Sequence, residues 1–444
     1  MKHRSPSSRA FATLLVLAVV ILAMAVIGMV QATAFSQAAS GRDAMARTRA
    51  YWAARAGLES TIARLEWDTQ NPDPEDAYST LDSMAEVAEG RVSGATWRIA
   101  TTVGKEQVPG PADEGAKLNV NRLTQEQLLL IEPFMTEDVA DGILDWVDED
   151  DDTRMLGAEV GYYQGLSYPY EPRNAPFRSI AELELVTGTW PEDVRGEDWN
   201  LNGILDPNED DGNASWPPDN ADGILQGGWS AILTTASIDG GLGASGSARL
   251  DLTTATDSEI VARTGVTTDQ ARVIVDYMQA TPTVTMGDFI RRDLQTLANV
   301  AFQAQGGRGQ APAVDALSRT QLGALLDEAS VGPSAGIEPG KLNINSCDAK
   351  TIEYLPEIDA TLADAIIAER AARPQGFTNI VQLLEVPGMS RTTLATMQDL
   401  LTVRSSVYAL TCRGKDELTG VEVEITATMD RSSLPVVLKD VRVR

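Results

Sequence analysis

The apolar and polar positions at the start of the chain predict one very long helix. An uninterrupted apolar run extends from Ala10 to Val30, about the 20 residues that one bilayer-spanning helix needs. From Ala44 to Glu66, apolar residues recur at helical spacing with charged residues between them. Asn71 and the residues after it, Pro-Asp-Pro, end this pattern. We therefore expect a helix over residues 11–70 that spans a membrane in its first half and is amphipathic in its second.

Alternating, β-rich sequence near both ends of the chain predicts strands. One segment covers residues 96–103, within a region 71–110. The others lie in residues 401–444, at 407–412, 421–428 and 436–443. Because roughly three hundred residues separate the two groups, the pattern favours one antiparallel sheet interrupted by an insertion over residues 111–400.

The insertion contains internal repeats. Each repeat begins with a basic residue, a leucine, and an Asn or Asp that can cap a helix start. A helix, a short connection and a second helix follow. The repeats begin at Lys117, Arg249 and Lys341 and extend near residues 117–190, 249–292 and 341–400, with second helices expected at 138–146, 268–278 and 362–370. This order is typical of tandem helix-hairpin-helix units.

A later segment repeats as well. Phe177, Ile180, Leu183, Val186 and Gly188 recur two hundred positions on as Phe377, Ile380, Leu383, Val386 and Gly388. A DNA-binding hairpin needs glycines for close approach to phosphate, with Lys or Arg nearby. The first hairpin, residues 132–138, and the third, 355–360, have no glycine, and we find a glycine turn only at Val386–Met389. We therefore expect packing or protein-binding modules and no nucleic-acid partner.

Composition and charge support this expectation. The 444 residues carry a formal net charge of −28, which repels nucleic acid and suits a cation-rich compartment. Basic residues at the extreme N-terminus, Lys2, Arg4 and Arg9, predict that this end is cytoplasmic and that the body lies outside. In an oxidising compartment, Cys347 and Cys412 can form a disulfide; the alternative is two separate buried thiols.

Residues 198–209 fit a calcium loop of the EF-hand type position by position. Gly203 stands at the sharp turn, and Pro207 together with two neutral Asn ligands lowers the affinity that we expect. The expected calcium ligands are the side chains of Asp198, Asn200, Asn202, Asp206 and Glu209 and the carbonyl of Ile204. Two further acidic segments, residues 145–152 and 218–225, are either weaker cation sites or plain acidic loops.

Catalytic motifs are not found in the sequence. The only histidine is His3, on the cytoplasmic side of the span, which excludes a His-based triad or zinc site in the exported part. There is no phosphate-binding loop and no dinucleotide-binding glycine run. We therefore interpret the protein as non-catalytic.

Several motifs carry a resemblance to a known family. Ser8-Arg-Ala-Phe-Ala-Thr-Leu-Leu-Val-Leu17 resembles the prepilin leader and first helix of type II secretion pseudopilins. Later motifs resemble protein K of the general secretion pathway, the GspK family. The resemblance is strongest over residues 8–66, 117–190 and 341–444. Those motifs are Asp145-Trp-Val-Asp148, Gly157–Tyr163, Asn174–Ile180, Lys341-Leu-Asn-Ile-Asn345 and Leu401–Ser406.

The resemblance implies an α+β fold, with a pilin-like N-terminal helix packed on an antiparallel sheet and a large inserted α-helical domain. It implies a leader over residues 1–10 that prepilin peptidase removes between Ala10 and Phe11. It further implies a single-pass inner-membrane protein with a periplasmic body that binds calcium. Its partners would be the I and J minor pseudopilins at the pseudopilus tip and the rest of the secretion machinery, which exports folded proteins across the outer membrane.

Two positions depart from the pilin pattern. Ala10 stands where pseudopilins usually carry glycine, and Leu15 stands where most pilins carry glutamate, a residue that this family characteristically lacks. The alternatives that the sequence leaves open are a minor pilin of a type IV pilus, a membrane-anchored helix-hairpin-helix protein for DNA uptake, and a single-span periplasmic enzyme.

Overall fold

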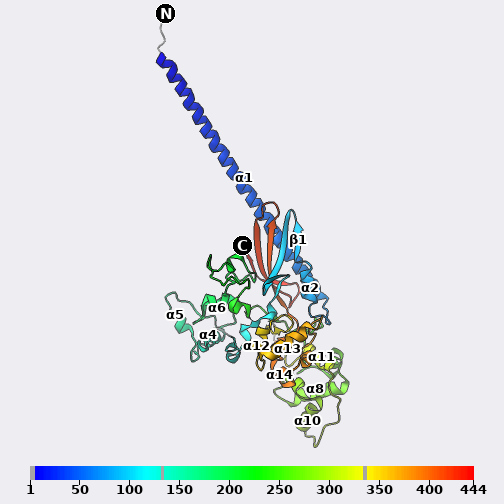
Figure 1. Cartoon of the computed structure of the whole chain (residues 1–444). Coiled ribbons are helices and arrows are strands. Elements are labelled where there is room, and N and C mark those ends of the chain that lie inside the picture. The colour runs from blue at the N-terminus through cyan, green and yellow to red at the C-terminus, as the bar shows by residue number, and fades with distance from the viewer. Residues whose placement is uncertain (1–5, 132–134, 334–337) are drawn as a thin grey trace.

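One helix dominates the shape of the molecule. The computed structural model describes residues 6–131, 135–333 and 338–444. Helix α1 (Pro6–Gln70) projects from a body that contains every other element (Figure 1). Its side chains from residue 11 to residue 38 are exposed, and an 18-residue window of this helix reaches a mean hydropathy of 3.0. The predicted long helix is therefore present, while Lys2, His3 and Arg4 lie outside the described residues.

The sheet joins the two ends of the chain. Its order is β1 (Glu89–Val92), β2 (Ala95–Val103), β13 (Val407–Asp416), β14 (Glu422–Asp430) and β15 (Val437–Val443), all antiparallel. Two short strands join it at the point where the insertion leaves: β3 (Glu106–Pro109) pairs with β2, and β4 (Ala112–Asp113) pairs with β13. The predicted strands at both ends therefore lie side by side, and the α+β fold class is confirmed.

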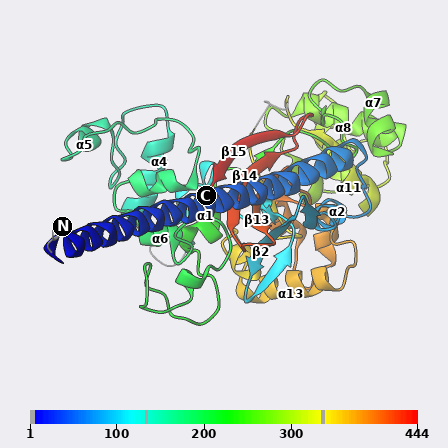
Figure 2. The same ribbon diagram turned by 90° about the horizontal axis from the view of Figure 1, so that it is seen from above.

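Small residues allow α1 to approach the sheet closely. Ala46, Ala50, Ala53 and Ala54 are fully buried on one face of the helix. A Cβ atom at Gly414 of β13 would overlap the carbonyl oxygen of Ala50. Larger side chains, among them Leu58, Leu65, Ile99 and Met429, complete the core between α1 and the sheet. The helix is thereby fixed to the central strand of the sheet, which Figure 2 shows from above.

The insertion is built from three units of one design. Each unit opens and closes with a two-residue strand, and the two strands pair in parallel. Between them lie a first helix, a second helix, a third short helix and a fourth helix. The pairs are β5 (Leu118–Asn119) with β6 (Leu233–Thr234), β8 (Leu250–Asp251) with β9 (Ala329–Ser330), and β11 (Leu342–Asn343) with β12 (Leu401–Thr402).

The helices of the first unit are α3 (Gln125–Leu128), α4 (Glu137–Val147), η3 (Ile180–Leu185) and α6 (Pro191–Arg195), with α5 (Val160–Gln164) as an addition. Those of the second are α7 (Asp257–Thr264), α8 (Thr268–Ala280), α9 (Met286–Arg291) and α11 (Arg319–Glu328), with α10 (Leu294–Ala304) added. Those of the third are α12 (Ala349–Glu353), α13 (Ala360–Ala371), η6 (Ile380–Glu385) and α14 (Arg391–Met397). The remaining short elements are α2 (Ser79–Ala85), η1 (Glu114–Ala116), η2 (Val120–Arg122), η4 (Pro207–Glu209), η5 (Gly228–Ala231), β7 (Ile238–Asp239) and β10 (Glu338–Pro339).

The three second helices, α4, α8 and α13, begin and end within two residues of their predicted bounds. The Asn of the first repeat caps a helix start, as predicted, but that helix is not the first α-helix of the unit. Asn119 caps the short helix η2 by accepting from the backbone N–H of Asn121, and Thr124 caps α3. The reason is that the strand and a turn come before the helix, so the helix start lies five residues further on.

A second asparagine in the repeat motif explains why the segment that begins at Phe177 recurs at Phe377. Asn121 donates to the carbonyl of Phe177 and accepts from its backbone N–H, at 3.0 and 2.7 Å. Asn345 makes the same two bonds with Phe377, at 2.8 Å each. Each amide side chain therefore satisfies both backbone groups of a buried residue and holds the third helix of its unit against the first.

Glycine turns are more frequent in the insertion than we expected. Gly188 and Gly265 adopt φ values of +78° and +68°, next to +93° for Gly388. The expectation of a single glycine turn is therefore wrong, because the hairpin after α7 and the one after η3 also need the left-handed conformation that glycine adopts freely. Of the first unit's leading hairpin, residues 132–134 lie outside the described residues.

The two cysteines do not form the disulfide that we considered. Both are free and buried. Cys347 belongs to the core that the first and third units share, whereas Cys412 belongs to the core between α1 and the sheet. Burial raises the pKa of both thiols to about 12, which keeps them protonated. The alternative of two separate buried thiols is the observed one.

One buried carboxylate joins the insertion to the sheet. Asp113, at the end of β4, is 8% exposed. It accepts from the backbone N–H of Gly115 at 2.7 Å, the side-chain amide of Asn343 at 2.9 Å and the hydroxyl of Ser405 at 2.9 Å, and also from Ser346. The groups that meet here come from the start of the insertion, its third unit and the strand that follows it.

Replacing Asp113 by Ala leaves four donors without their acceptor. We expect the free energy of unfolding to fall by roughly 3 kcal/mol, because unpaired buried donors keep their full desolvation cost. Urea unfolding of the full chain in detergent micelles, followed by tryptophan fluorescence, measures the loss. Asp440→Ala, at an exposed position of β15, is the control and should leave the midpoint nearly unchanged. Equal midpoints for the two variants would contradict the role of Asp113.

Candidate metal centre

The predicted calcium loop lies against the sheet, beside the C-terminal end of the chain (Figure 1). The backbone N–H of Thr102 on β2 donates to the carbonyl of Gly203 at 2.9 Å. The hydroxyl of Thr411 on β13 donates to the carbonyl of Asn202 at 2.7 Å. The loop is thus fastened to two strands, one from each end of the chain.

Asp198, at position one of the loop, is 6% exposed and turned inward. Its two oxygens accept from the backbone N–H groups of Asn202 and Gly203, at 3.0 Å each. Gly203 has a φ of +69°, which is the reason for a glycine at position six. Burial raises the pKa of Asp198, and the backbone hydrogen bonds oppose this shift.

Glu209, at position twelve, closes over the loop. It is 1% exposed, and its oxygens accept from the backbone N–H groups of Trp199 and Asp206, at 3.1 Å each. Burial, together with the nearby charges of Asp198 and Asp206, raises its pKa to about 7. A buried carboxylate among other negative charges is stabilised when it takes up a proton or binds a cation.

Asp206, at position nine, is the centre of the loop's side-chain contacts. Its Oδ2 accepts from the amide nitrogens of Asn200 and Asn202, at 2.8 and 3.0 Å. Its Oδ1 pairs with the guanidinium of Arg413, which also donates to Glu424 at 2.8 Å. The Oδ1 atom of Asn200 is buried and has no hydrogen-bond partner among the residues that the structure describes.

The donor chemistry of the loop fits a hard divalent cation. The predicted ligands are all oxygens, three of them carboxylates, and Asp198, Asn202 and Glu209 are brought together in a buried loop. Among the residues that the structure describes, no group of three or more His, Cys, Asp or Glu side chains is arranged so that it could hold a metal ion. The carboxylates are instead held by backbone N–H groups and by Arg413, and the two asparagine side chains direct their amide nitrogens to Asp206.

The acidic segment 218–225 is held by hydrogen bonds to its own carboxylates. Asp219 accepts from the backbone N–H groups of Asp211, Gly212 and Ala221, at 3.0, 2.8 and 2.7 Å. Asp222 is exposed and accepts from Ile224 at 2.8 Å. These bonds account for the sequence pattern of residues 218–225 as a network of local turns.

The acidic segment 145–152 is more than a solvated loop. Asp145 is fully buried and pairs with Arg154 at 3.2 Å. Glu159, which we did not include in this cluster, is 4% exposed, and neither of its oxygens has a hydrogen-bond partner among the described residues. Burial, together with the nearby charges of Asp145 and Asp148, raises the pKa of Glu159 to about 7.

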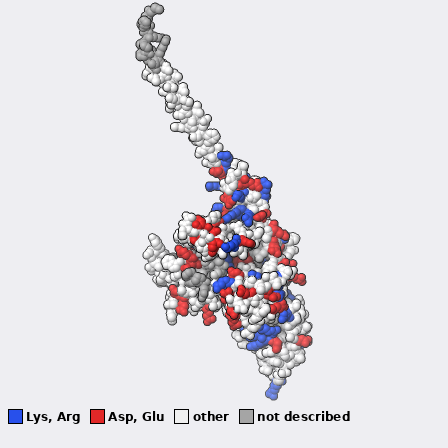
Figure 3. All heavy atoms as spheres, in the orientation of Figure 1, with Lys and Arg blue, Asp and Glu red and all other residues white. Residues whose placement is uncertain are grey.

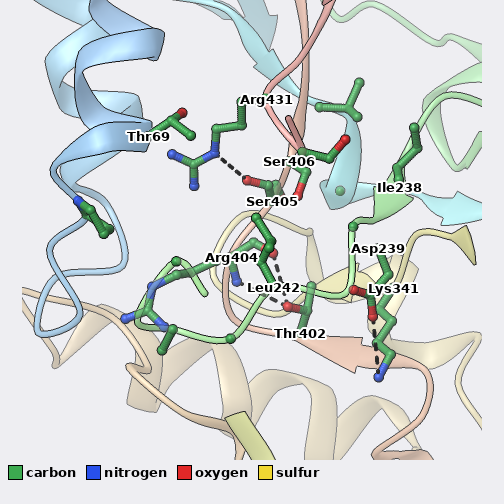
Figure 4. A pocket seen from close by; sticks show the side chains of 18 of the residues that line it. Thr69, Ile238, Asp239, Leu242, Lys341, Thr402, Arg404, Ser405, Ser406 and Arg431 are labelled. Atoms are coloured by element: carbon green, nitrogen blue, oxygen red, sulfur yellow. Dashed lines mark hydrogen bonds and ion pairs between the residues drawn. The ribbon is translucent and has the colours of Figure 1, made fainter. Parts of the chain in front are cut away.

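A separate cavity of about 320 Å³ lies at the base of α1 (Figure 4). Arg431 donates to the carbonyl of Ser405 at 3.1 Å, and Lys341 lies 3.8 Å from Asp239. Arg404 donates to the carbonyls of Thr378 and Pro74. These cations therefore already bind backbone carbonyls and neighbouring carboxylates. The residues that line the cavity come from α1, the sheet and the insertion, so it lies where these three parts meet.

Comparison with known proteins gives two family matches. Residues 102–196 match the family model described as Type II secretion system (T2SS), protein K, and residues 339–402 match the model of the helix-hairpin-helix motif. Residues 102–196 are therefore similar to T2SS protein K, and the whole third unit is similar to the helix-hairpin-helix motif.

The other comparisons are weaker. Among curated proteins, none matches the chain. A chain of the crystal structure titled "The Crystal Structure of the GspK-GspI-GspJ complex from enterotoxigenic Escherichia coli Type 2 Secretion System" aligns with a TM-score of 0.47 and 12% identity. The alignment covers 91% of this chain and 99% of that chain.

The raised pKa of Glu159 predicts a pH dependence. Its ordinary pKa is 4.5, so between that value and about 7 the folded state keeps a proton that the unfolded state has lost. This difference favours folding at low pH, and the benefit is lost as the pH rises through about 7. In calcium-free buffer, Glu159→Gln should therefore flatten the fall in unfolding free energy between about pH 5 and pH 8.

Chemical unfolding across this pH range checks the prediction. Glu149→Gln is the matched control, because Glu149 lies in the same acidic segment and is exposed. An identical pH profile for wild type and Glu159→Gln would show that Glu159 titrates normally.

Proposed function

We propose that this chain, whose residues 102–196 match T2SS protein K, is the protein K minor pseudopilin of a type II secretion system. The family match is the observation that carries the proposal. The matched segment begins on strand β2 and extends through the helices of the first unit as far as the end of α6, so it joins the sheet to the insertion. The proposed role is architectural and requires no catalytic group.

The long helix supplies the anchor. The part of α1 that projects from the body carries no charged side chain between residue 11 and Arg42, as the white upper half of the helix in Figure 3 shows. Such a stretch is stable in a bilayer before assembly and against other apolar helices afterwards. The basic N-terminus favours a cytoplasmic start, an inner-membrane span and a periplasmic body.

The position of the insertion supports a place at the pseudopilus tip. The helical units lie at the end of the body away from the apolar half of α1, with α4 toward the left of the body and α8 toward the right (Figures 1 and 2). A subunit stacked beyond this end would meet that bulk. Leu15 agrees with this place, because a pilin glutamate would pair with the N-terminal amine of a neighbour ahead, and a tip subunit has none.

The proposed partners are the I and J minor pseudopilins, prepilin peptidase and the remaining secretion machinery. A complex of GspK with GspI and GspJ is known from enterotoxigenic Escherichia coli. Together these subunits would begin or cap the pseudopilus that exports folded proteins across the outer membrane.

Calcium is the proposed ligand of the loop 198–209. Asp198, Asn200, Asn202, Asp206, Glu209 and the carbonyl of Ile204 would hold the ion. Its charge would offset three carboxylates that burial brings together, and its binding would fix a loop that spans the insertion and the sheet. The ion would therefore brace the insertion on the strands.

Processing tests the pseudopilin proposal. Co-expression of the full chain with a prepilin peptidase should yield a mature protein whose N-terminal sequence begins at Phe11. Ala10→Leu should leave most of the chain uncut, because a bulky side chain replaces the small one at the cleavage site. Ala18→Leu, inside the apolar run, is the control and should be cut normally. N-terminal sequencing that finds another start, or an uncut wild type, would refute the proposal.

Loss of two ligands tests the calcium proposal. Asp198→Ala with Glu209→Ala should abolish calcium binding at the loop, because the two carboxylates at positions one and twelve are removed. Isothermal titration of the detergent-solubilised full chain with calcium measures this. Asp269→Ala with Asp364→Ala removes two exposed carboxylates and should leave binding unchanged. An unaltered titration for the first double variant would rule out the loop.

A further inference from the structure

The loop already holds one positive charge of the protein's own. Arg413, on β13, lies between Asp206 of the loop and Glu424 of β14. The side chains of Asp206 and Glu424 are each 13% exposed, so water screens these ion pairs only partly. The guanidinium thus occupies one oxygen of a carboxylate that the calcium loop needs.

The second oxygen of Asp206 is occupied as well. The amide nitrogens of Asn200 and Asn202 both point to it, whereas a cation would require their oxygens. Asn202 also lies 3.2 and 3.3 Å from the two carboxylate oxygens of Glu424 through the same nitrogen. Arg413, Asp206, Asn202 and Glu424 therefore form one connected network that joins the loop to the β13–β14 pair.

A metal ion that binds Asp206 has to replace this network. We infer that Arg413 is a built-in competitor of calcium, which lowers the affinity of the loop and links its occupancy to the β13–β14 pair. The inference rests on the proposed calcium site. When the ion binds, Asp206 passes from the guanidinium to the metal, Arg413 keeps Glu424 alone, and the two amides turn their oxygens inward. When the ion leaves, Arg413 returns and offsets one of the three loop charges.

This arrangement distinguishes Arg413 from Arg444, another cation near the loop. Arg444 donates to the backbone carbonyl of Asn200 at 3.1 Å and is exposed. It adds a positive charge close to the site but occupies no carboxylate of the loop. Removal of either arginine raises the local negative potential, whereas only removal of Arg413 frees a ligand.

Calcium titration of three versions of the detergent-solubilised full chain tests the inference: wild type, Arg413→Gln and Arg444→Gln. We expect Arg413→Gln to bind calcium about tenfold more tightly than wild type, since a competing ion pair is lost. Arg444→Gln should change the dissociation constant by less than about twofold, because water and salt screen the interaction of an exposed charge with the ion. Equal or weaker binding by Arg413→Gln, or an equal gain in both variants, would overturn the inference.

A second readout does not depend on these variants. Hydrogen exchange of wild-type amides in β13 and β14 should change when calcium is added, while the amides of β1 should not. Unchanged exchange in β13 and β14 at saturating calcium would overturn the link to the sheet, even where Arg413→Gln folds poorly.

The outcomes separate this inference from the calcium proposal. If wild type binds calcium and the Asp198/Glu209 double variant does not, the loop is the site, and the Arg413 result then decides the inference alone. If neither wild type nor Arg413→Gln binds calcium, both proposals fail. Binding by Arg413→Gln alone would show competition strong enough to exclude the ion from wild type, which supports the inference.

Discussion

The structure depends on the hydrogen bonds of one buried carboxylate, Asp113. The chain leaves the sheet at β4 and returns to it almost three hundred residues later, and Asp113 binds groups on both sides of that gap, including Asn343 and Ser405. A carboxylate in a buried site is stable only when donors surround it. The site therefore forms only when the third helical unit, the returning chain and β4 are all in place. This makes the insertion a fixed extension of the sheet.

A second connection acts on the same sheet from the first unit. The loop 198–209 contacts Thr102 on β2 and Thr411 and Arg413 on β13, so it touches strands that come from opposite ends of the chain. The small residues of α1 pack closely on Gly414 of the central strand, so they fix the position of α1 relative to that strand. A cation at the loop would thus act on the insertion, the sheet and the helix together. Such connections suit a subunit whose proposed place is the end of a filament.

Elements with strong local patterns could be predicted from the sequence, and contacts between distant segments could not. The long helix, the terminal strands and helices α4, α8 and α13 follow from hydrophobic periodicity. The third helix of the second unit, α9, was missed because it lacks the Phe-x-x-Ile spacing of the repeated segment. No sequence pattern indicates the role of Arg413, because its ion pair with Asp206 joins residues more than two hundred positions apart. Burial of Cys347 and Cys412 in different cores likewise depends on tertiary packing.

The central claim is that this chain is the protein K component of a minor pseudopilin complex. Co-expression of the full chain with the I and J components of its own secretion system, followed by affinity purification through the chain and size-exclusion chromatography in detergent, tests it most directly. The account predicts one stable complex that contains all three proteins. Elution of the chain apart from both components, under conditions in which each of the three is folded, would contradict the claim.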